Sequence, residues 1–179
     1  MKKDILLVVD VQNDFVDGAL GTKEAQAMLP ELLKTVKGFK GEVIFTLDTH
    51  PEDYLKTQEG RNLPVPHCIR GTKGWELVPE LEKFRETHGC KIYEKPTFGS
   101  TALAEDLRLR FETGAIGSVT VCGLCTDICV ISNALLLKAS MPELEIRVLP
   151  ECCAGVTPEK HAHALDVLAS CQILPPPKA

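Results

Sequence analysis

The chain has 179 residues, of which 44% are hydrophobic and 25% are charged, and its formal net charge is −5. This length is enough for one domain with a sizeable core, so we expect residues 1–179 to form a single domain. The negative charge, and the absence of any basic run longer than Lys2-Lys3, argue against a general binder of nucleic acid or of anionic membranes.

No stretch of the sequence is apolar over the length that a membrane span requires. The apolar run Ile5–Val9 follows two lysines, but Asp4 and Asp10 bound it and no cleavage site comes after it. Such a run is too short for a signal-peptide core. We therefore expect a cytoplasmic protein, in which the eight cysteines are thiols, metal ligands or catalytic groups and not disulfides.

Short apolar runs spaced along the chain predict β-strands. Their continuous apolar character is typical of parallel strands that are buried on both faces of a sheet. The predicted strands are Ile5–Val9, Glu42–Leu47, Lys91–Tyr93, Ser118–Cys122, Glu145–Leu149 and Gln172–Leu174.

Helical patterns alternate with these strands. One helix is expected to begin near Pro30, a second at Thr101 with Ser100 as its N-cap, a third near Thr126, and a fourth after the N-cap Thr157. This alternation predicts an α/β protein with three layers, α/β/α, and a mostly parallel, doubly wound sheet of about six strands, a Rossmann-like arrangement.

Polar side chains follow four of the predicted strands. Asp10 ends the first, Asp48 and His50 follow the second, Lys95 follows the third, and the stretch GLCTDICV, residues 123–130, follows the fourth. Ligands of open α/β sheets bind outside the carboxyl ends of the strands. The sequence therefore predicts one site at this edge, built from an acid, potential metal ligands, a lysine and a thiol.

Cys129 is the candidate nucleophile, because it lies in the first turn of the helix that opens near Thr126. Exposed N–H groups and the helix dipole there favour a thiolate and are expected to lower the thiol pKa. Lys95 would stabilise that thiolate and Asp10 could take its proton. A buried core cysteine explains the position of Cys129 equally well, and the convergence of Asp10 and Lys95 decides for the nucleophile.

Two other uses of the cysteines are less favoured. Cys122 and Cys125 form a C-x-x-C pair, but a redox pair of the thioredoxin type needs its first cysteine at a helix N-terminus, and Cys122 belongs to a strand. A structural zinc site that adds Cys152 and Cys153 is less favoured still, because adjacent cysteines and strand positions give poor tetrahedral geometry.

Asp48 and His50 are two residues apart, so in an extended segment their side chains share one face. His67 returns after a long loop rich in Pro, Gly and His, and Glu59 lies between. One carboxylate and two imidazoles with open positions suit zinc, manganese or iron. A polar strand end without a metal is the alternative.

Three motifs in this order resemble those of cysteine hydrolases of the isochorismatase-like superfamily, close to the nicotinamidases. They are DVQNDF at residues 10–15, EKPTFGST at residues 94–101 and GLCTDICV at residues 123–130. The match extends from Asp10 to about Pro158. The resemblance implies that Asp10, Lys95 and Cys129 form a catalytic triad, that the Leu124–Cys125 peptide is cis, and that the amides of Cys125 and Cys129 form an oxyanion hole.

The nicotinamidase resemblance also implies one divalent metal ion, with zinc as the first choice, held by Asp48, His50 and His67, with Glu59 as a weaker fourth assignment. The metal would hold the pyridine nitrogen of nicotinamide or a ligated water, and Phe15 would stack on the ring, although a core position is its alternative. The expected reaction converts nicotinamide to nicotinate and ammonia through a thioester. The family often forms oligomers, so a homo-oligomer is expected.

Two further functions stay open. Many nicotinamidases have a tryptophan three residues before the last metal histidine, and here Pro64 occupies that position, while Trp75 lies beyond the loop. This departure favours a cysteine hydrolase that acts on another small amide or carbamoyl compound. From a different class, a non-catalytic thiol or metal-binding protein would depend on Cys122 more than on Cys129.

Overall fold

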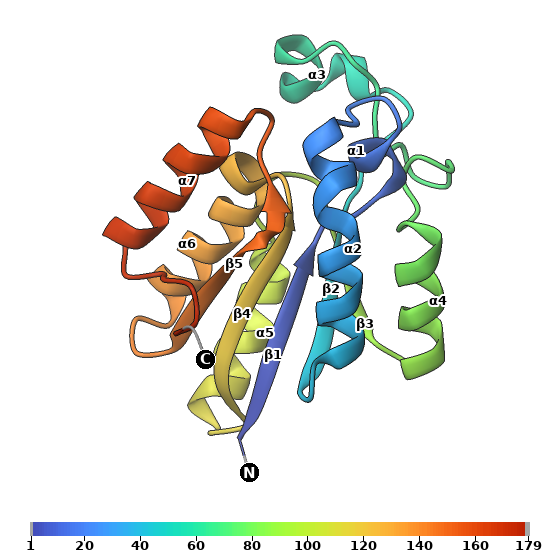
Figure 1. Ribbon diagram of the computed structural model, residues 1–179. Helices are drawn as coiled ribbons and strands as arrows, with labels where there is room; N and C mark the ends of the chain where they lie inside the picture. Colours follow the sequence, from blue (N-terminus) through green and yellow to red (C-terminus); the bar gives the residue numbers. More distant parts are fainter. Residues whose placement is uncertain (1, 178–179) are drawn as a thin grey trace.

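Five parallel strands form the centre of the computed structural model, which describes residues 2–177 (Figure 1). The strand order in the sheet is β3-β2-β1-β4-β5, and every neighbouring pair is parallel. The strands are β1 (Lys3–Val9), β2 (Glu42–Asp48), β3 (Lys91–Lys95), β4 (Ile116–Leu124) and β5 (Glu145–Ala154). The order reverses between β1 and β4, and such a switch point is where doubly wound sheets bind ligands.

Helices cover both faces of the sheet, which confirms the predicted three-layer architecture (Figure 1). On one face lie α2 (Lys23–Gly38) and α4 (Pro79–His88). On the other lie α5 (Thr101–Glu112), α6 (Ile131–Ser140) and α7 (Pro158–Ser170). Shorter elements surround the carboxyl edge: α1 (Asn13–Val16), the 3-10 turn η1 (Tyr54–Lys56), α3 (Gln58–Asn62) and the π-helical turn η2 (Thr126–Val130).

The core explains why the strands at the switch point approach closely. The apolar residues of β1, from Ile5 to Val9, are 0% exposed, as expected for a central strand with helices on both sides. Gly123 near the end of β4 has φ of 117°, and a Cβ there would lie 2.1 Å from the Val9 carbonyl oxygen. Only glycine therefore allows β4 to pass β1 at this point.

Two expectations about the elements were wrong. Helix α2 begins at Lys23 and not near Pro30, because the Thr22 hydroxyl caps it by accepting a hydrogen bond from the Ala25 N–H at 3.0 Å. The proline is an exposed residue inside the helix. The segment Gln172–Leu174 forms no sixth strand but one isolated bridge between Leu174 and Arg147, and Pro175 directly after it has no N–H to extend a ladder.

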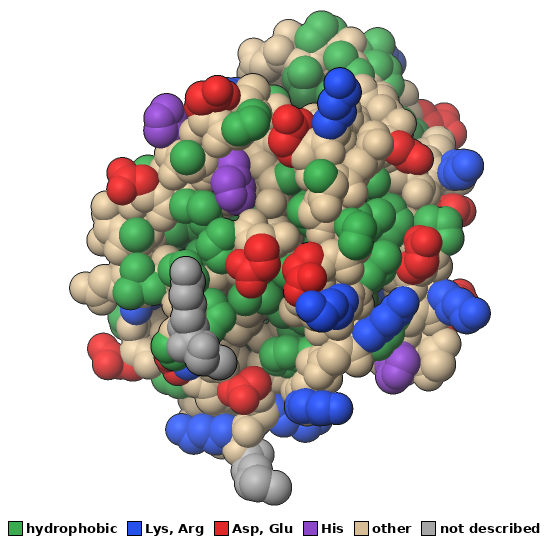
Figure 2. Space-filling model, in the orientation of Figure 1, with side chains coloured by type: hydrophobic (Ala, Val, Ile, Leu, Met, Phe, Trp, Pro, Cys, Tyr) green, Lys and Arg blue, Asp and Glu red, His purple; other side chains and the backbone are tan. Residues whose placement is uncertain are grey.

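The segment between Asp48 and Pro79 folds over the carboxyl edge of the sheet, where η1 and α3 lie (Figure 1). The face drawn in Figure 2 shows Lys and Arg side chains gathered mostly in its lower half, towards the end at which the strands begin. Within residues 2–177, no helix combines the length and the apolar character needed to cross a bilayer.

Candidate active site

The structure brings the predicted strand-end residues into contact around one lysine. Asp10 directly follows β1, while Asp48 and Lys95 are the last residues of β2 and β3. All three are buried. The Lys95 Nζ lies 2.6 Å from the Asp10 Oδ2, 3.2 Å from the Asp48 Oδ1 and 3.4 Å from the Cys129 Sγ. The ammonium group therefore joins the two carboxylates to the thiol without access to bulk water.

Asp10 is held at the point where the chain leaves the sheet. Its φ of 48° lies in the left-handed region, and its N–H donates to the Thr46 hydroxyl at 3.2 Å. The Thr46 hydroxyl in turn donates to the Asp10 Oδ1 at 2.6 Å. Burial raises the pKa of Asp10, and the Lys95 charge opposes that rise. A carboxylate whose proton affinity is raised in this way is suited to accept a proton near neutral pH.

Cys129 lies in η2, immediately before α6, as the sequence predicts. The side-chain amide of Asn133 donates to the Cys129 carbonyl oxygen at 2.8 Å and to the Phe98 carbonyl oxygen at 3.1 Å, and its oxygen accepts from the Ser100 N–H at 3.0 Å. Asn133 thus ties the loop that follows Lys95 to the turn that carries the thiol. The Leu124–Cys125 peptide that precedes the turn is cis.

The expected pKa of Cys129 is contradicted. The helix N-terminus and Lys95 were expected to lower it, but burial raises it well above its ordinary value, and the charge of Asp10 acts in the same direction. Burial lowers the pKa of Lys95, but the charges of Asp10 and Asp48 outweigh it and the net shift is upward. The resting site therefore holds a neutral thiol beside a charged lysine.

Four potential metal ligands meet beside this cluster. Ligand atoms of Asp48, His50, Glu59 and His67 all lie within 4.8 Å of one another, the one such group among the described residues. The His50 Nε2 is 2.9 Å from the Asp48 Oδ2 and 3.7 Å from the Glu59 Oε1, and the His67 Nε2 is 3.6 Å and 3.8 Å from the same two atoms.

These distances, from 2.9 to 3.8 Å, bracket the ligand separations expected around a divalent metal ion. Tetrahedral zinc with bonds of about 2.0–2.2 Å places its ligands roughly 3.3–3.6 Å apart. The His67 Nδ1 donates to the Val65 carbonyl oxygen at 2.8 Å, which leaves the Nε2 lone pair facing the carboxylates. Burial would raise the pKa of Asp48, but the hydrogen bond with His50 and the Lys95 charge lower it overall. The carboxylate is therefore ionised, as a metal ligand must be.

Aromatic rings pack against the two histidines. The Tyr54 ring centroid lies 4.7 Å from that of His50 and 5.0 Å from that of His67, and the Tyr54 hydroxyl donates to the Leu63 carbonyl oxygen at 2.9 Å. Phe15 meets the edge of His67 at 5.6 Å. Phe15 is thus placed beside the predicted metal site. Tyr54 was missed, because nothing in the sequence marks which ring of a loop turns inward.

Trp75 does not take the place of the tryptophan that Pro64 replaces. Its indole N–H donates to the Thr49 hydroxyl at 2.8 Å. Thr49 stands between Asp48 and His50, so its side chain points to the opposite face of the extended segment. The indole therefore supports the segment from the side away from the candidate metal ligands.

Gln12, Asp14 and Asn133 also position the site. Gln12 and Asp14 belong to the motif at residues 10–15, which marks them as part of a family pattern but does not indicate what they do in the site. Asp14, expected to be structural, accepts a hydrogen bond from the Cys68 N–H at 2.8 Å, next to the candidate ligand His67. All eight cysteines, each within residues 2–177, are free thiols, and Cys122 is fully buried in β4. The cysteine zinc site does not occur in this part of the chain.

A doubly wound sheet with a buried thiol, carboxylate and lysine beside a histidine-carboxylate cluster defines the class of α/β cysteine hydrolases. The family model described as Isochorismatase domain matches residues 4–174, and the chain belongs to this family. The "Uncharacterized isochorismatase family protein PncA" of Bacillus subtilis is 33% identical over 177 residues, which are 94% of this chain and 95% of that protein. The "Nicotinamidase/pyrazinamidase" of Mycobacterium tuberculosis is 28% identical over 183 residues, 94% and 95% of the two chains.

Solved structures agree with this assignment. The nicotinamidase/pyrazinamidase PncA from Bacillus subtilis has a TM-score of 0.82 at 30% identity, covering 98% of this chain and all of that one (100%). The pyrazinamidase of Pyrococcus horikoshii in complex with zinc has a TM-score of 0.78 at 29% identity, with coverages of 96% and 97%. The predicted resemblance to the nicotinamidase branch is confirmed, and so is the enzyme class, hydrolases of carbon–nitrogen bonds other than peptide bonds.

Proposed function

We propose that this protein, as a single hydrolase domain, is a metal-assisted cysteine amidohydrolase that converts nicotinamide to nicotinate and ammonia through a thioester. One observation carries the proposal: the Lys95 Nζ stands 2.6 Å from Asp10 and 3.4 Å from the Cys129 Sγ, at the rim of a four-ligand cluster. The names of the related proteins support nicotinamide as the substrate.

In the first half of the reaction, Cys129 attacks the carboxamide carbon. Its thiol is neutral at rest, because burial raises its pKa, and its sulfur and the Asp10 carboxylate lie 3.4 Å and 2.6 Å from the same Lys95 Nζ. Asp10 takes the thiol proton as the sulfur–carbon bond forms, which avoids a free buried thiolate. The N–H groups of Cys125 and Cys129 then stabilise the oxyanion.

In the second half, the carbon–nitrogen bond breaks and Asp10 returns the proton to the leaving nitrogen, which departs as ammonia. A water molecule then attacks the thioester carbon while Asp10 accepts one of its protons, and the carbon–sulfur bond breaks. Asp10 gives this proton to the Cys129 sulfur, which restores the thiol and releases nicotinic acid. The acid ionises to nicotinate and its proton is taken up by the ammonia. Lys95 stays charged throughout, because the net effect of its neighbours raises its pKa, and it offsets the charge of Asp10.

Asp48, His50 and His67 would hold the metal, with Glu59 as the fourth side chain within reach. When bound there, a divalent cation supplies a Lewis acid that orients the pyridine nitrogen or polarises water. Phe15, at the edge of His67, limits the space on one side of the substrate ring. These residues fix the ring so that the carboxamide faces Cys129 at near-attack distance.

A second candidate function keeps the thiol chemistry and changes the substrate to another small amide or a carbamoyl compound. Pro64 stands where many nicotinamidases have an aromatic side chain, and Trp75 turns away from the ligands. A pocket with one aromatic wall fewer is less selective for a flat ring. A panel of nicotinamide, pyrazinamide, and aliphatic amides and carbamoyl compounds, compared by kcat/KM, separates the two candidates.

Ammonia release from nicotinamide by the zinc-loaded protein tests the proposal. We expect Cys129→Ala to lower kcat by about 10⁴-fold or more, as removal of a catalytic nucleophile does. Cys122→Ser is the matched control, because it changes another buried thiol within the same stretch and is expected to retain activity. Activity that survives Cys129→Ala would refute the mechanism. Loss with Cys122→Ser alone would favour the non-catalytic thiol or metal-binding protein.

A further inference from the structure

Gln12 is a buried side chain that the proposed mechanism does not use. It is 0% exposed and lies two residues after Asp10. Its Nε2 donates to the Asp48 carbonyl oxygen at 2.9 Å and to the Trp75 carbonyl oxygen at 2.7 Å, and its Oε1 accepts from the Asp48 N–H at 2.8 Å. Both amide hydrogens and the amide oxygen are therefore engaged, and two of the three bonds go to the backbone of one metal-ligand candidate.

The reason for this arrangement is the end of the ladder between β1 and β2. Strand pairing runs as far as Val9 opposite Thr46. At Asp10 the backbone turns into the left-handed region, with φ of 48°, and leaves the sheet. Asp48, two residues beyond Thr46, would then lack a strand partner on that side. The Gln12 amide offers one donor and one acceptor, as a peptide group would, and continues the pairing.

We propose that Gln12 is a positioning residue that sets the affinity of the metal site through the backbone of Asp48. The two carboxylate oxygens of Asp48 face different partners: Oδ1 lies 3.2 Å from the Lys95 Nζ, and Oδ2 lies 2.9 Å from the His50 Nε2. A shift of the Asp48 backbone moves both oxygens. Gln12 therefore fixes the position of Asp48 relative to both Lys95 and the candidate ligand His50.

The hydrogen bond from Gln12 to the Trp75 carbonyl oxygen connects Gln12 to a second support of the same segment. Trp75, whose carbonyl oxygen accepts from Gln12, also donates from its indole to Thr49, the residue between the two ligands Asp48 and His50. The segment 48–50 is thus supported on one side by Gln12 and on the other by Trp75, and Gln12 connects the two supports. This inference rests on the proposed metal ligands and does not depend on the substrate.

Zinc affinity measured by competition with a chromophoric chelator tests the proposal. Gln12→Glu keeps the size of the side chain, removes both donors and places one carboxylate oxygen against the two carbonyl oxygens of Asp48 and Trp75. Gln12→Met removes all three hydrogen bonds without adding charge. Loss of a group that orients a metal ligand costs 10–100-fold in metal affinity, and we expect both variants to bind zinc at least about 10-fold more weakly. The absorption spectrum of the cobalt-loaded variants is expected to change as well.

Gln26→Glu is the matched control, because Gln26 is exposed on α2 and donates one hydrogen bond to the Val16 carbonyl oxygen at 3.3 Å. It is expected to keep the wild-type zinc affinity and cobalt spectrum. Thermal unfolding of the metal-free variants separates positioning from simple loss of stability.

Wild-type zinc affinity in both Gln12 variants would overturn the proposal, whatever their stability. A Gln12 variant that yields no folded protein would also overturn it, since Gln12 would then support the whole fold. These readouts require no turnover, so an enzyme that fails to hydrolyse nicotinamide but shows the expected zinc difference would contradict only the proposed function.

Discussion

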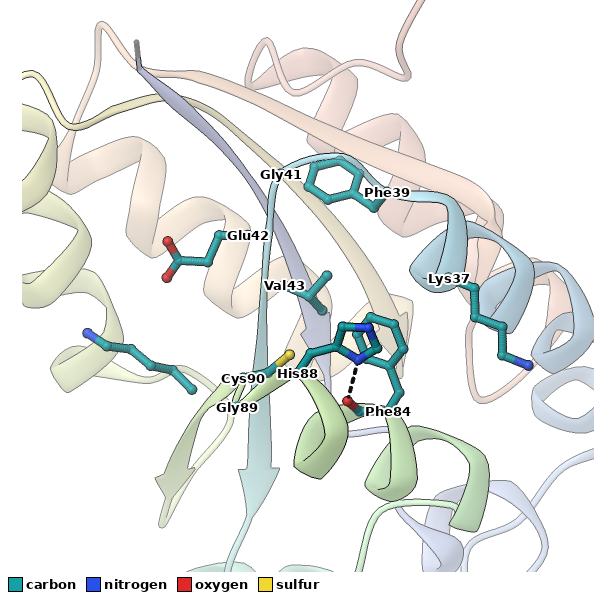
Figure 3. A pocket seen from close by; sticks show the side chains of 10 residues that line it. Lys37, Phe39, Gly41, Glu42, Val43, Phe84, His88, Gly89 and Cys90 are labelled. Carbon is teal, nitrogen blue, oxygen red and sulfur yellow. Dashed lines mark hydrogen bonds between the residues drawn. The ribbon is translucent and has the colours of Figure 1, made fainter.

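The two edges of the sheet carry the same kinds of charged side chain in opposite settings. At the carboxyl edge, Lys95 and Asp10 pair at 2.6 Å and are 1% and 0% exposed. At the amino edge, Arg110 and Glu42 pair at 2.7 Å but are 19% and 24% exposed. There Glu42 lines an open cavity of about 370 Å³ (Figure 3). The amino edge, which we call the open edge, thus has an open cavity. The carboxyl edge, which we call the closed edge, has charged groups that converge away from water, and reactivity requires such groups.

Burial makes the charges at the closed edge depend on one another. In a low-dielectric interior, each charge is stable only while its partner is present, whereas water compensates for a lost partner at the surface. Lys95 compensates two carboxylates, those of Asp10 and Asp48. The amino edge has no such dependence, because its ion pair remains in contact with solvent.

The largest expected effect comes from Lys95→Met. It leaves two buried carboxylates without their cation, and breaking a buried pair in this way costs about 3–5 kcal/mol of the free energy of unfolding. Activity is expected to be lost as well. Arg110→Met, the matched change at the amino edge, is expected to cost no more than about 1 kcal/mol. Chemical denaturation of both variants measures the difference, and equal costs would abolish the contrast between the edges.

The convergence at the carboxyl edge could be predicted because its signals are local. Each apolar run that forms a strand ends at a polar residue, and parallel strands bring those ends to one edge of the sheet. Asp10, Asp48 and Lys95 follow from this rule alone. The motif at residues 123–130 added Cys129, and the nicotinamidase resemblance added His67; the positions of both depend on turns that the rule does not describe.

The supporting residues could not be predicted, since their partners are distant in sequence. Gln12 bonds Asp48, 36 residues away, and Asn133 bonds Phe98, 35 residues away. The prediction that the pKa of Cys129 is lowered was wrong for a related reason. A helix N-terminus is visible in the sequence, but the burial that outweighs it depends on the packing of the whole edge.

Metal binding is expected to raise the free energy of unfolding by an amount smaller than the cost of Lys95→Met and larger than the effect of His161→Gln. A ligand that binds only the folded protein adds about 2.7 kcal/mol to the free energy of unfolding at 100 times its dissociation constant. We expect zinc to raise the melting temperature of the wild type and a chelator to reverse this. His67→Ala is expected to abolish the shift, whereas His88→Ala, at the amino-edge cavity (Figure 3), retains it. A zinc-dependent shift that survives His67→Ala would place the metal elsewhere.

The smallest expected effect concerns His161, at the start of α7, which lies near the closed edge. The residue is half-buried, and its Nδ1 is 2.8 Å from the hydroxyl of Thr126, the first residue of η2. Burial lowers the pKa of His161, and the charge of Asp127 opposes this only in part. The unfolded chain therefore binds a proton at a higher pH than the folded protein does.

The sign of the pH dependence follows from this difference. Between the ordinary histidine pKa of about 6.5 and the lower folded value, the unfolded state holds more protons, so stability falls as the pH decreases through this window. In metal-free protein, urea unfolding between pH 7.5 and 5 is expected to show a shallower decline for His161→Gln than for the wild type. His163→Gln, an exposed position on the same helix, is expected to keep the wild-type slope. Identical slopes for all three proteins would mean that His161 titrates alike in the folded and unfolded states, and that the closed edge does not reach as far as α7.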